Sequence, residues 1–438
     1  MAFREIIPDS SRSQIAPVVL ESPNYTRPLV VVTTLFFMWG FLTCLNDILV
    51  PHLKSIFDLS YAKVMLVQFA FFSAYFLFSV PWSRIVNFIG YQRAMVVGLV
   101  TMALGAFLFL PAASAASYPL FLTALLILAM GITGLQVAAN PYVVVLGKPE
   151  TGSSRLNLTQ AFNSLGTTIA PKIGGLLILS AAPLAIEQLQ QLTPQALQAY
   201  RVQQAASVKL PYAVIGVALI LLAVLIGTFK LPKIDHAAYH RGENVSDSIW
   251  KHPNLVLAAI GIFAYVGAEV SIGSFLVNYF EVPDIAGFSP KTAAGFVSFY
   301  WGGAMVGRFL GAGLLRRFKP GKSLALCAIF AATLVISSML LSGHTAMWTI
   351  LAVGLFNSIM FPTIFSLGVA ELGPLTGNGS GLLNMAIVGG AILPVLQGVI
   401  ADRVGIHHAF ILPVICYLYI LHYGLSGSKP NSERYAAG

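Results

Sequence analysis

The sequence predicts an all-α membrane protein with twelve transmembrane helices. Of its 438 residues, 57% are hydrophobic and only 9% are charged, whereas soluble domains carry about 25% charged residues. Apolar runs of about 20 residues recur along the chain, and a helix of that length crosses the hydrocarbon core of a bilayer. A transmembrane barrel would need short segments of alternating polarity. Stretches such as 214–226 (VIGVALILLAVLI) do not alternate, which excludes that architecture.

Twelve apolar runs define the expected helices, with boundaries good to a few residues. In the first half of the chain they cover 28–50, 64–88, 92–113, 119–147, 155–181 and 211–231. In the second half they cover 253–280, 290–316, 321–342, 345–370, 379–402 and 407–426.

Two polar segments interrupt this series. Residues 182–210 are rich in Gln and carry Leu and Ala at helical spacing, which predicts an external loop with a short amphipathic helix. Residues 232–251 lie at the midpoint of the chain and predict a cytoplasmic linker. We therefore expect two six-helix bundles, and the divisions of the chain are 1–27 (tail), 28–231 (bundle), 232–251 (linker), 252–426 (bundle) and 427–438 (tail).

The basic residues predict the orientation, because cytoplasmic loops are enriched in Lys and Arg. With the N-terminus in the cytoplasm, 18 of the 25 Lys and Arg fall on the cytoplasmic side, and Arg308 is counted there at the end of the eighth helix. Both termini are then cytoplasmic. The net charge of +9 follows from this topology and not from a basic patch on a soluble face, so no nucleic-acid partner is expected.

The two halves resemble each other weakly. Asp47 on the first helix corresponds to Glu269 on the seventh. Asn140-Pro141 is expected to break the fourth helix, and Phe361-Pro362 lies at the matching place in the tenth. Two repeats with interrupted helices indicate a transporter with a site near the midplane of the bilayer. An enzyme is not expected, because the H-E-x-x-H, G-x-S-x-G and phosphate-binding glycine motifs are absent from the sequence.

Asp47 and Glu269 are the acids that lie well inside apolar runs. A charge at the bilayer centre costs at least ~2.5 kcal/mol, so each acid is interpreted as a cation or substrate ligand, with a structural ion pair as the alternative. Lys172, inside the fifth helix, extends its amine to the helix end, faces a cavity, or pairs with a carboxylate, and these alternatives stay open.

Carboxamides and aromatic side chains accompany these acids. Gln136 and Asn140 are four residues apart and share one helix face. Amides hydrogen-bond adjacent sugar hydroxyls and aromatic rings stack on sugar C–H faces, so the pattern favours a sugar site. Amides also join helices in lipid, and both roles are expected here. The candidate substrate-binding residues are Gln68, Gln136, Asn140, Gln160, Asn163, Tyr265, Glu269, Trp301, Asn357, Phe361 and Asn384.

Four segments make the sequence similar to a known family. They are LNDILVPHL (45–53), GLQVAANPYVVVLG (134–147), SSRLNLTQAFNSLG (153–166) and FPTIFSLGVAELG (361–373). With these segments the chain resembles the fucose–galactose–glucose:cation symporter family of the major facilitator superfamily. The resemblance implies the major facilitator fold, alternating access, and cation-driven import of a monosaccharide across a bacterial inner membrane.

The resemblance also assigns roles to single residues. The L-fucose members use an acid in the LND setting, here Asp47, and an asparagine in the FNS motif, here Asn163. They carry a glutamate where this chain has Gln136, a neutral residue in place of Glu269, and a tyrosine in place of Phe361. These departures resemble the glucose/galactose branch, some of whose relatives use sodium.

The resemblance therefore implies symport of glucose or galactose with sodium or a proton, and Asp47 is expected to couple the cation. If the cation is sodium, Asp47 is a metal ligand and Asn46 and Thr43 are expected to add oxygen ligands. The alternatives are an L-fucose or N-acetylhexosamine symporter and a proton-coupled exporter of small molecules. We expect a monomer with no prosthetic cofactor, whose partners are the sugar, a monovalent cation and the lipid bilayer.

Overall fold

The computed structural model describes residues 25–57, 66–178, 192–232 and 248–429. Throughout these ranges the regular secondary structure is helical. The expected tails, the inter-bundle linker and the start of the 182–210 loop lie largely outside the described residues.

The helices follow the expected apolar runs, except that α1 ends at Phe57 and not at the expected residue 50. Those of the first half are α1 (Thr26–Phe57), α3 (Leu66–Ile89), α4 (Tyr91–Ser114), α5 (Tyr118–Val145), α6 (Gly152–Ile178), α8 (Pro194–Ala205) and α9 (Lys209–Thr228). Those of the second half are α10 (Pro253–Glu281), α11 (Pro290–Leu314), α12 (Pro320–Leu340), α13 (Gly343–Asn357), α14 (Met360–Gly368), α15 (Thr376–Met385), α16 (Gly389–Val404), α17 (Ile406–Ala409) and α18 (Ile411–His422). Short 3-10 turns and one π turn join several of them.

Within the described ranges, 10 helical segments are long and apolar enough to cross a membrane. Helices α6 and α11 are not among them, although they contain 27 and 25 residues. Polar side chains lower their hydropathy: α6 carries a stripe of amides and hydroxyls, and α11 carries Arg308. The short amphipathic helix expected in the 182–210 loop is confirmed as α8, whose N-cap Thr193 accepts a hydrogen bond from the Ala196 amide.

The expected helix interruptions are half confirmed. Helix α5 continues through Asn140 and Pro141 to Val145, so the predicted break there is wrong. Proline lacks a backbone N–H, and because Pro141 lies one turn before the helix end, the helix tolerates that loss. The tenth predicted helix does divide, since α13 ends at Asn357 and α14 begins at Met360, but the gap precedes Phe361-Pro362, which lie in the first turn of α14.

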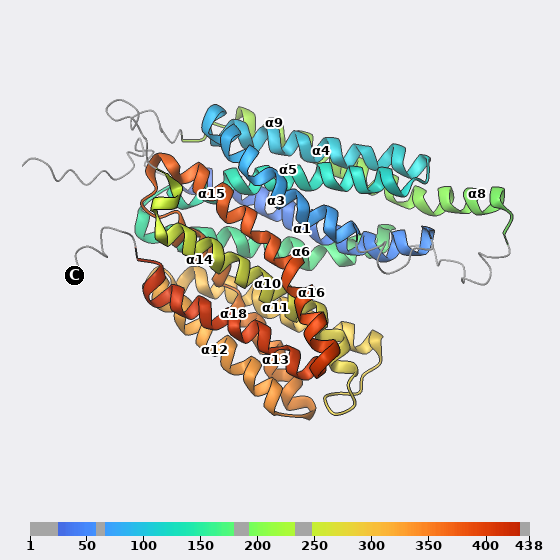
Figure 1. Ribbon diagram of the computed structural model, residues 1–438. Helices are drawn as coiled ribbons and strands as arrows, with labels where there is room; N and C mark the ends of the chain where they lie inside the picture. The colour runs from blue at the N-terminus through green and yellow to red at the C-terminus, as the bar shows by residue number, and fades with distance from the viewer. Residues whose placement is uncertain (1–24, 58–65, 179–191, 233–247, 430–438) are drawn as a thin grey trace, which may run out of the picture.

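The chain forms two groups of helices. In Figure 1 the helices α1 to α9 lie above most of the second half, α6 runs along the boundary between the groups, and α15 reaches up to the level of α3. Helix α6 packs on α11 and α14, and α15 packs on α3 and α5. Within the first group α1 and α6 pack closely, because Gly40 has no side chain to meet the backbone of Asn163.

Hydrogen bonds close one end of the contact between the two groups. Asn87 Nδ2 donates to Asn378 Oδ1 at 2.6 Å, near the end of α3 and the start of α15. Ser154 Oγ at the start of α6 donates to the Ala312 carbonyl oxygen near the end of α11 at 2.5 Å. The hydroxyls of Ser153 and Ser366 lie 2.6 Å apart. We call this end, defined by these three residue pairs, the closed end.

Candidate substrate and cation site

Glu269, in the middle of α10, is paired with a base. One turn earlier, Tyr265 donates its hydroxyl to Glu269 Oε1 at 2.7 Å. Arg308 Nη2 lies 3.7 Å from the same oxygen, and both charged side chains are only 13% exposed. The arginine neutralises the carboxylate, as a charge in low-polarity surroundings requires.

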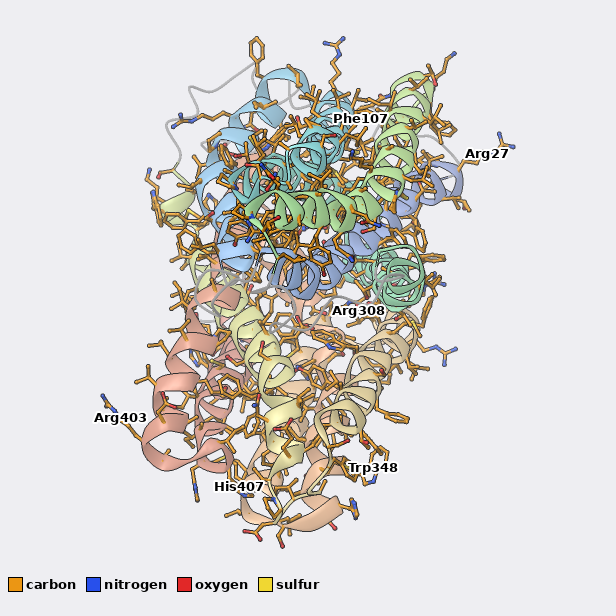
Figure 2. All side chains as sticks on the ribbon, turned by 90° about the vertical axis from the view of Figure 1, so that its right-hand side faces the viewer. Arg27, Phe107, Arg308, Trp348, Arg403 and His407 are labelled. Carbon is orange, nitrogen blue, oxygen red and sulfur yellow. The ribbon has the colours of Figure 1, made fainter. Side chains whose placement is uncertain are left out.

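Arg308 connects the two groups of helices. Its Nη1 donates to the hydroxyl of Ser164 on α6, and its Nε donates to the Ser358 carbonyl oxygen at 3.2 Å. Figure 2 shows Arg308 where the two groups meet, whereas Arg27 and Arg403 project away from the protein. A single guanidinium therefore joins an acid of the second half to a hydroxyl of the first.

The expected position of Arg308 at the cytoplasmic end of the eighth helix is therefore wrong. Arg308 lies within α11, whereas the basic pair Arg316 and Arg317 follows the end of that helix. Arg308 lies eight positions before Arg316, and in a helix this spacing corresponds to about 12 Å. That spacing is the signal in the sequence that could have identified Arg308 as an interior arginine.

Further polar and aromatic side chains surround the pair. The Tyr300 hydroxyl donates to the Glu269 carbonyl oxygen at 3.3 Å, and Asn357 Nδ2 donates to the Tyr300 hydroxyl at 2.8 Å. The ring of Phe361 lies 6.4 Å from that of Tyr265. The structure thus brings together four predicted site residues, Glu269, Tyr265, Asn357 and Phe361. Together with Arg308 and Tyr300 they form what we call the Glu269 cluster.

The amides of the first half lie in different settings. Gln136 Nε2 donates to the Tyr75 hydroxyl at 2.7 Å, and Asn163 Nδ2 donates to the Phe36 carbonyl oxygen at 3.0 Å. Gln160 is buried, and its side chain makes no hydrogen bond to a described residue. It lies one turn before Ser164, which Arg308 contacts, so Gln160 shares the helix face that Ser164 turns toward the Glu269 cluster.

Three other candidates lie outside the Glu269 cluster. Asn140 is fully buried, and its amide finds no hydrogen-bonding partner among the described residues. Asn384 Nδ2 donates to the Ser380 carbonyl oxygen at 2.9 Å, within α15. Trp301 is 43% exposed, with its ring edge-to-face on Tyr300 at 5.1 Å.

The predicted cation site is only partly described. Thr43 Oγ1 donates to the Trp39 carbonyl oxygen at 2.8 Å, one turn back in α1. Asn46 and Asp47 belong to the same helix, but their side chains lie outside the described residues. The side chains of Gln68 and Lys172 do so as well. Cation coupling by Asp47 therefore stays a prediction.

The geometry of the Glu269 cluster suits a polyhydroxyl ligand. A distance of 3.7 Å between Arg308 Nη2 and Glu269 Oε1 exceeds a normal hydrogen bond of about 2.7–3.2 Å. Neither Arg308 Nη2 nor Glu269 Oε2 makes a hydrogen bond to a described residue. A strong donor and a strong acceptor are thus available side by side, beside aromatic rings. Adjacent hydroxyls of one sugar can give to the carboxylate and accept from the guanidinium.

Comparison with known proteins gives consistent matches. Residues 31–387 match the family described as Major Facilitator Superfamily. A glucose/galactose transporter of Brucella abortus is 53% identical over 93% of this chain and 95% of its own length. The L-fucose-proton symporter of Escherichia coli is 37% identical over 91% of this chain and 93% of its own length.

Among solved structures, the similar ones include a crystal structure of FucP, a Major Facilitator Superfamily transporter, in the outward conformation. It superposes with a TM-score of 0.83 at 35% identity, covering 92% of this chain and 99% of that one.

Proposed function

Because the chain belongs to the Major Facilitator Superfamily, and within it to the fucose–galactose–glucose:cation symporter family, we propose that it is a secondary transporter that imports glucose or galactose together with a cation. The observation that carries this proposal is the loose Glu269–Arg308 pair, which offers unused hydrogen-bonding atoms where the two helix groups meet. Its named relatives are transporters, and this chain is likewise a transporter and not an enzyme.

We propose twelve membrane-spanning helices in two six-helix bundles, with both termini in the cytoplasm of a bacterium. The ten apolar segments, together with α6 and α11, supply that number. In this orientation the closed end faces the cytoplasm, and the binding site opens to the outside. The likeness to a FucP structure in the outward conformation supports that assignment.

In the proposed complex the sugar lies against the Glu269 cluster. Glu269 Oε2 accepts from one hydroxyl, and Arg308 Nη2 donates to its neighbour. Gln160 approaches from the first half, while the rings of Tyr265 and Phe361 cover an apolar face of the sugar. A ligand held by both halves is released only when they separate, which links binding to alternating access.

For the cation we propose Asp47 as the coupling residue. If sodium is the driving ion, oxygen atoms of Asn46 or Thr43 complete its coordination, because hard cations prefer oxygen. If a proton drives transport, protonation of the Asp47 carboxylate alone neutralises it. The name of the Escherichia coli relative favours the proton.

Uptake by purified protein in proteoliposomes tests the proposal. Labelled D-glucose should accumulate under either a sodium gradient or a proton gradient, and unlabelled D-galactose should compete. L-fucose should compete poorly, because Gln136 and Phe361 replace the residues of the L-fucose members. Equal competition by L-fucose would overturn the substrate assignment, and no accumulation under either gradient would overturn import by symport.

A further inference from the structure

A large groove lies away from the Glu269 cluster, between α1, α6 and α9. It has a volume of about 1240 Å³, which exceeds the ~300–1,000 Å³ of a typical small-molecule pocket. Apolar side chains line most of its wall, among them Leu29, Val30, Phe37, Leu221, Leu222 and Leu225. Val30 is 59% exposed and Leu221 is 65% exposed, so the groove opens at the outer surface of the helix bundle.

One end of this groove is basic. Lys148, Arg155 and Arg316 line it there, and none of the three forms an ion pair with a described residue. The guanidinium of Arg155 donates to uncharged acceptors, the carbonyl oxygens of Val143 at 3.1 Å and Val144 at 2.6 Å. Among the described residues, Glu150 is the acid that interacts electrostatically with Arg155, so the described wall of this end keeps a net positive charge.

The apolar wall and the basic end together indicate which class of ligand fits the groove. A soluble anion would leave the apolar wall uncovered, and a neutral lipid would leave the basic end without a counter-charge. Basic pockets between membrane helices on the cytoplasmic side suit anionic lipid headgroups. We propose that the groove binds an anionic phospholipid, with its phosphate against Lys148 and Arg316 and its acyl chains between α1, α6 and α9. Only the assignment to the cytoplasmic leaflet rests on the proposed function.

The same site lies across both halves of the protein. Lys148 and Arg155 belong to the first half, and Arg316 follows α11 in the second. Ser154, which also lines the groove, donates to the Ala312 carbonyl oxygen at the closed end. A headgroup that contacts both halves requires them to be close at this end. Because a ligand favours the state that it binds more tightly, the lipid stabilises the closed end.

Lipid binding is measured first, by native mass spectrometry of the full-length protein with dioleoyl phosphatidylglycerol or dioleoyl phosphatidylcholine. The wild type should retain phosphatidylglycerol preferentially. Arg316→Gln should weaken that binding about fivefold, as expected for one basic residue at a lipid headgroup. Arg317→Gln removes the neighbouring charge outside the groove and should have no effect. Equal retention of the two lipids, or equal effects of the two variants, would overturn the proposal.

The apolar wall is tested with a matched pair on α9. Leu221→Trp fills the groove and should reduce phosphatidylglycerol binding at least fivefold. Val224→Trp places the same ring at an exposed position that does not line the groove, and it should bind lipid as the wild type does. If Leu221→Trp binds the lipid normally, the acyl chains lie elsewhere and the groove assignment fails.

Stabilisation of the closed end is then followed by amide hydrogen exchange in nanodiscs. The start of α6 and the end of α11 should exchange more slowly in phosphatidylglycerol than in phosphatidylcholine for the wild type. Arg316→Gln should abolish that difference. A lipid difference that persists in this variant would overturn the link between headgroup and closure. None of these measurements requires sugar, so their failure is distinguishable from failure of the proposed transport function.

Discussion

Arg308 Nη2 lies 3.7 Å from Glu269 Oε1, and the same guanidinium donates through Nη1 to Ser164 in the other half of the protein. The arginine thus neutralises the buried acid and joins the two helix groups. A sugar that binds between the two charged groups would change both interactions together. In the proposed transport cycle, sugar binding would therefore act directly on a contact between the two halves.

The first prediction concerns the charge pair itself. Arg308→Gln leaves Glu269 without its counter-charge, so the free energy of unfolding should fall by about 3 kcal/mol. The double variant Arg308→Gln/Glu269→Gln should recover most of that loss, because no unpaired charge remains. Unfolding in mixed detergent micelles measures both, and a double-mutant cycle isolates the pair.

Arg317→Gln serves as the control for this prediction, since Arg317 is exposed and lies beyond the end of α11. It should change the free energy of unfolding by no more than about 0.5 kcal/mol. If the two single losses simply add in the double variant, Arg308 and Glu269 do not interact in the folded protein.

The second prediction concerns orientation of the carboxylate. Tyr265→Phe removes the 2.7 Å hydrogen bond to Glu269 Oε1. Hydrogen bonds to charged groups contribute about 1.5–3 kcal/mol, so the Kd for D-glucose should rise at least about tenfold. Tyr279→Phe is the matched control, because Tyr279 is also fully buried on α10 but donates to the Ser338 carbonyl oxygen at 2.9 Å. Equal Kd values for the two variants would remove Tyr265 from the site.

The third prediction separates two amides of α6. Gln160→Ala should weaken sugar binding about three- to tenfold, because the lost hydrogen bond is worth ~0.5–1.5 kcal/mol. The free energy of unfolding of this variant should equal that of the wild type. Asn163→Ala removes the 3.0 Å bond to the Phe36 carbonyl oxygen of α1. Its free energy of unfolding should therefore fall by about 1 kcal/mol. Binding titrations and unfolding measurements on both variants test these two roles. A stability loss confined to Gln160→Ala would mean that Gln160, and not Asn163, joins the helices.

The fourth prediction assigns coupling to Asp47. Asp47→Asn should abolish accumulation of glucose against its gradient, because an amide needs no cation to neutralise it. Exchange of labelled for unlabelled glucose should persist at nearly the wild-type rate. Glu269→Gln should show the opposite, with weakened binding and exchange. Accumulation at the wild-type level by Asp47→Asn would transfer the coupling role to Glu269.

Much of the fold follows from the sequence, because an apolar run long enough to cross the bilayer satisfies its backbone hydrogen bonds by forming a helix. The amphipathic α8 and most helix bounds agree with expectation, whereas α1 runs to Phe57 and not to 50, and the tenth helix divides just before the expected Phe361-Pro362. The continuous α5 also differs from expectation, since the effect of a proline depends on its distance from the helix end.

The sequence predicts less of the site than of the fold. Glu269, Tyr265, Asn357 and Phe361 stand out in the sequence as polar or aromatic residues in apolar helices, and the structure brings them together. Arg308 was missed, because a basic residue near a helix end resembles a loop residue. Helix rotation also decides which amides bind each other, so the pairing of Gln136 with Tyr75 could not be predicted from one chain.

The most direct test of cation-coupled import is the cation flux that the sugar itself drives. Unenergised proteoliposomes, loaded with a pH-sensitive or sodium-sensitive dye, receive D-glucose on the outside. Symport predicts that glucose entering down its gradient carries one of these cations inward, and that Asp47→Asn abolishes the cation signal. If glucose equilibrates across the membrane without moving either cation, the protein is a facilitator and the proposed coupling is contradicted.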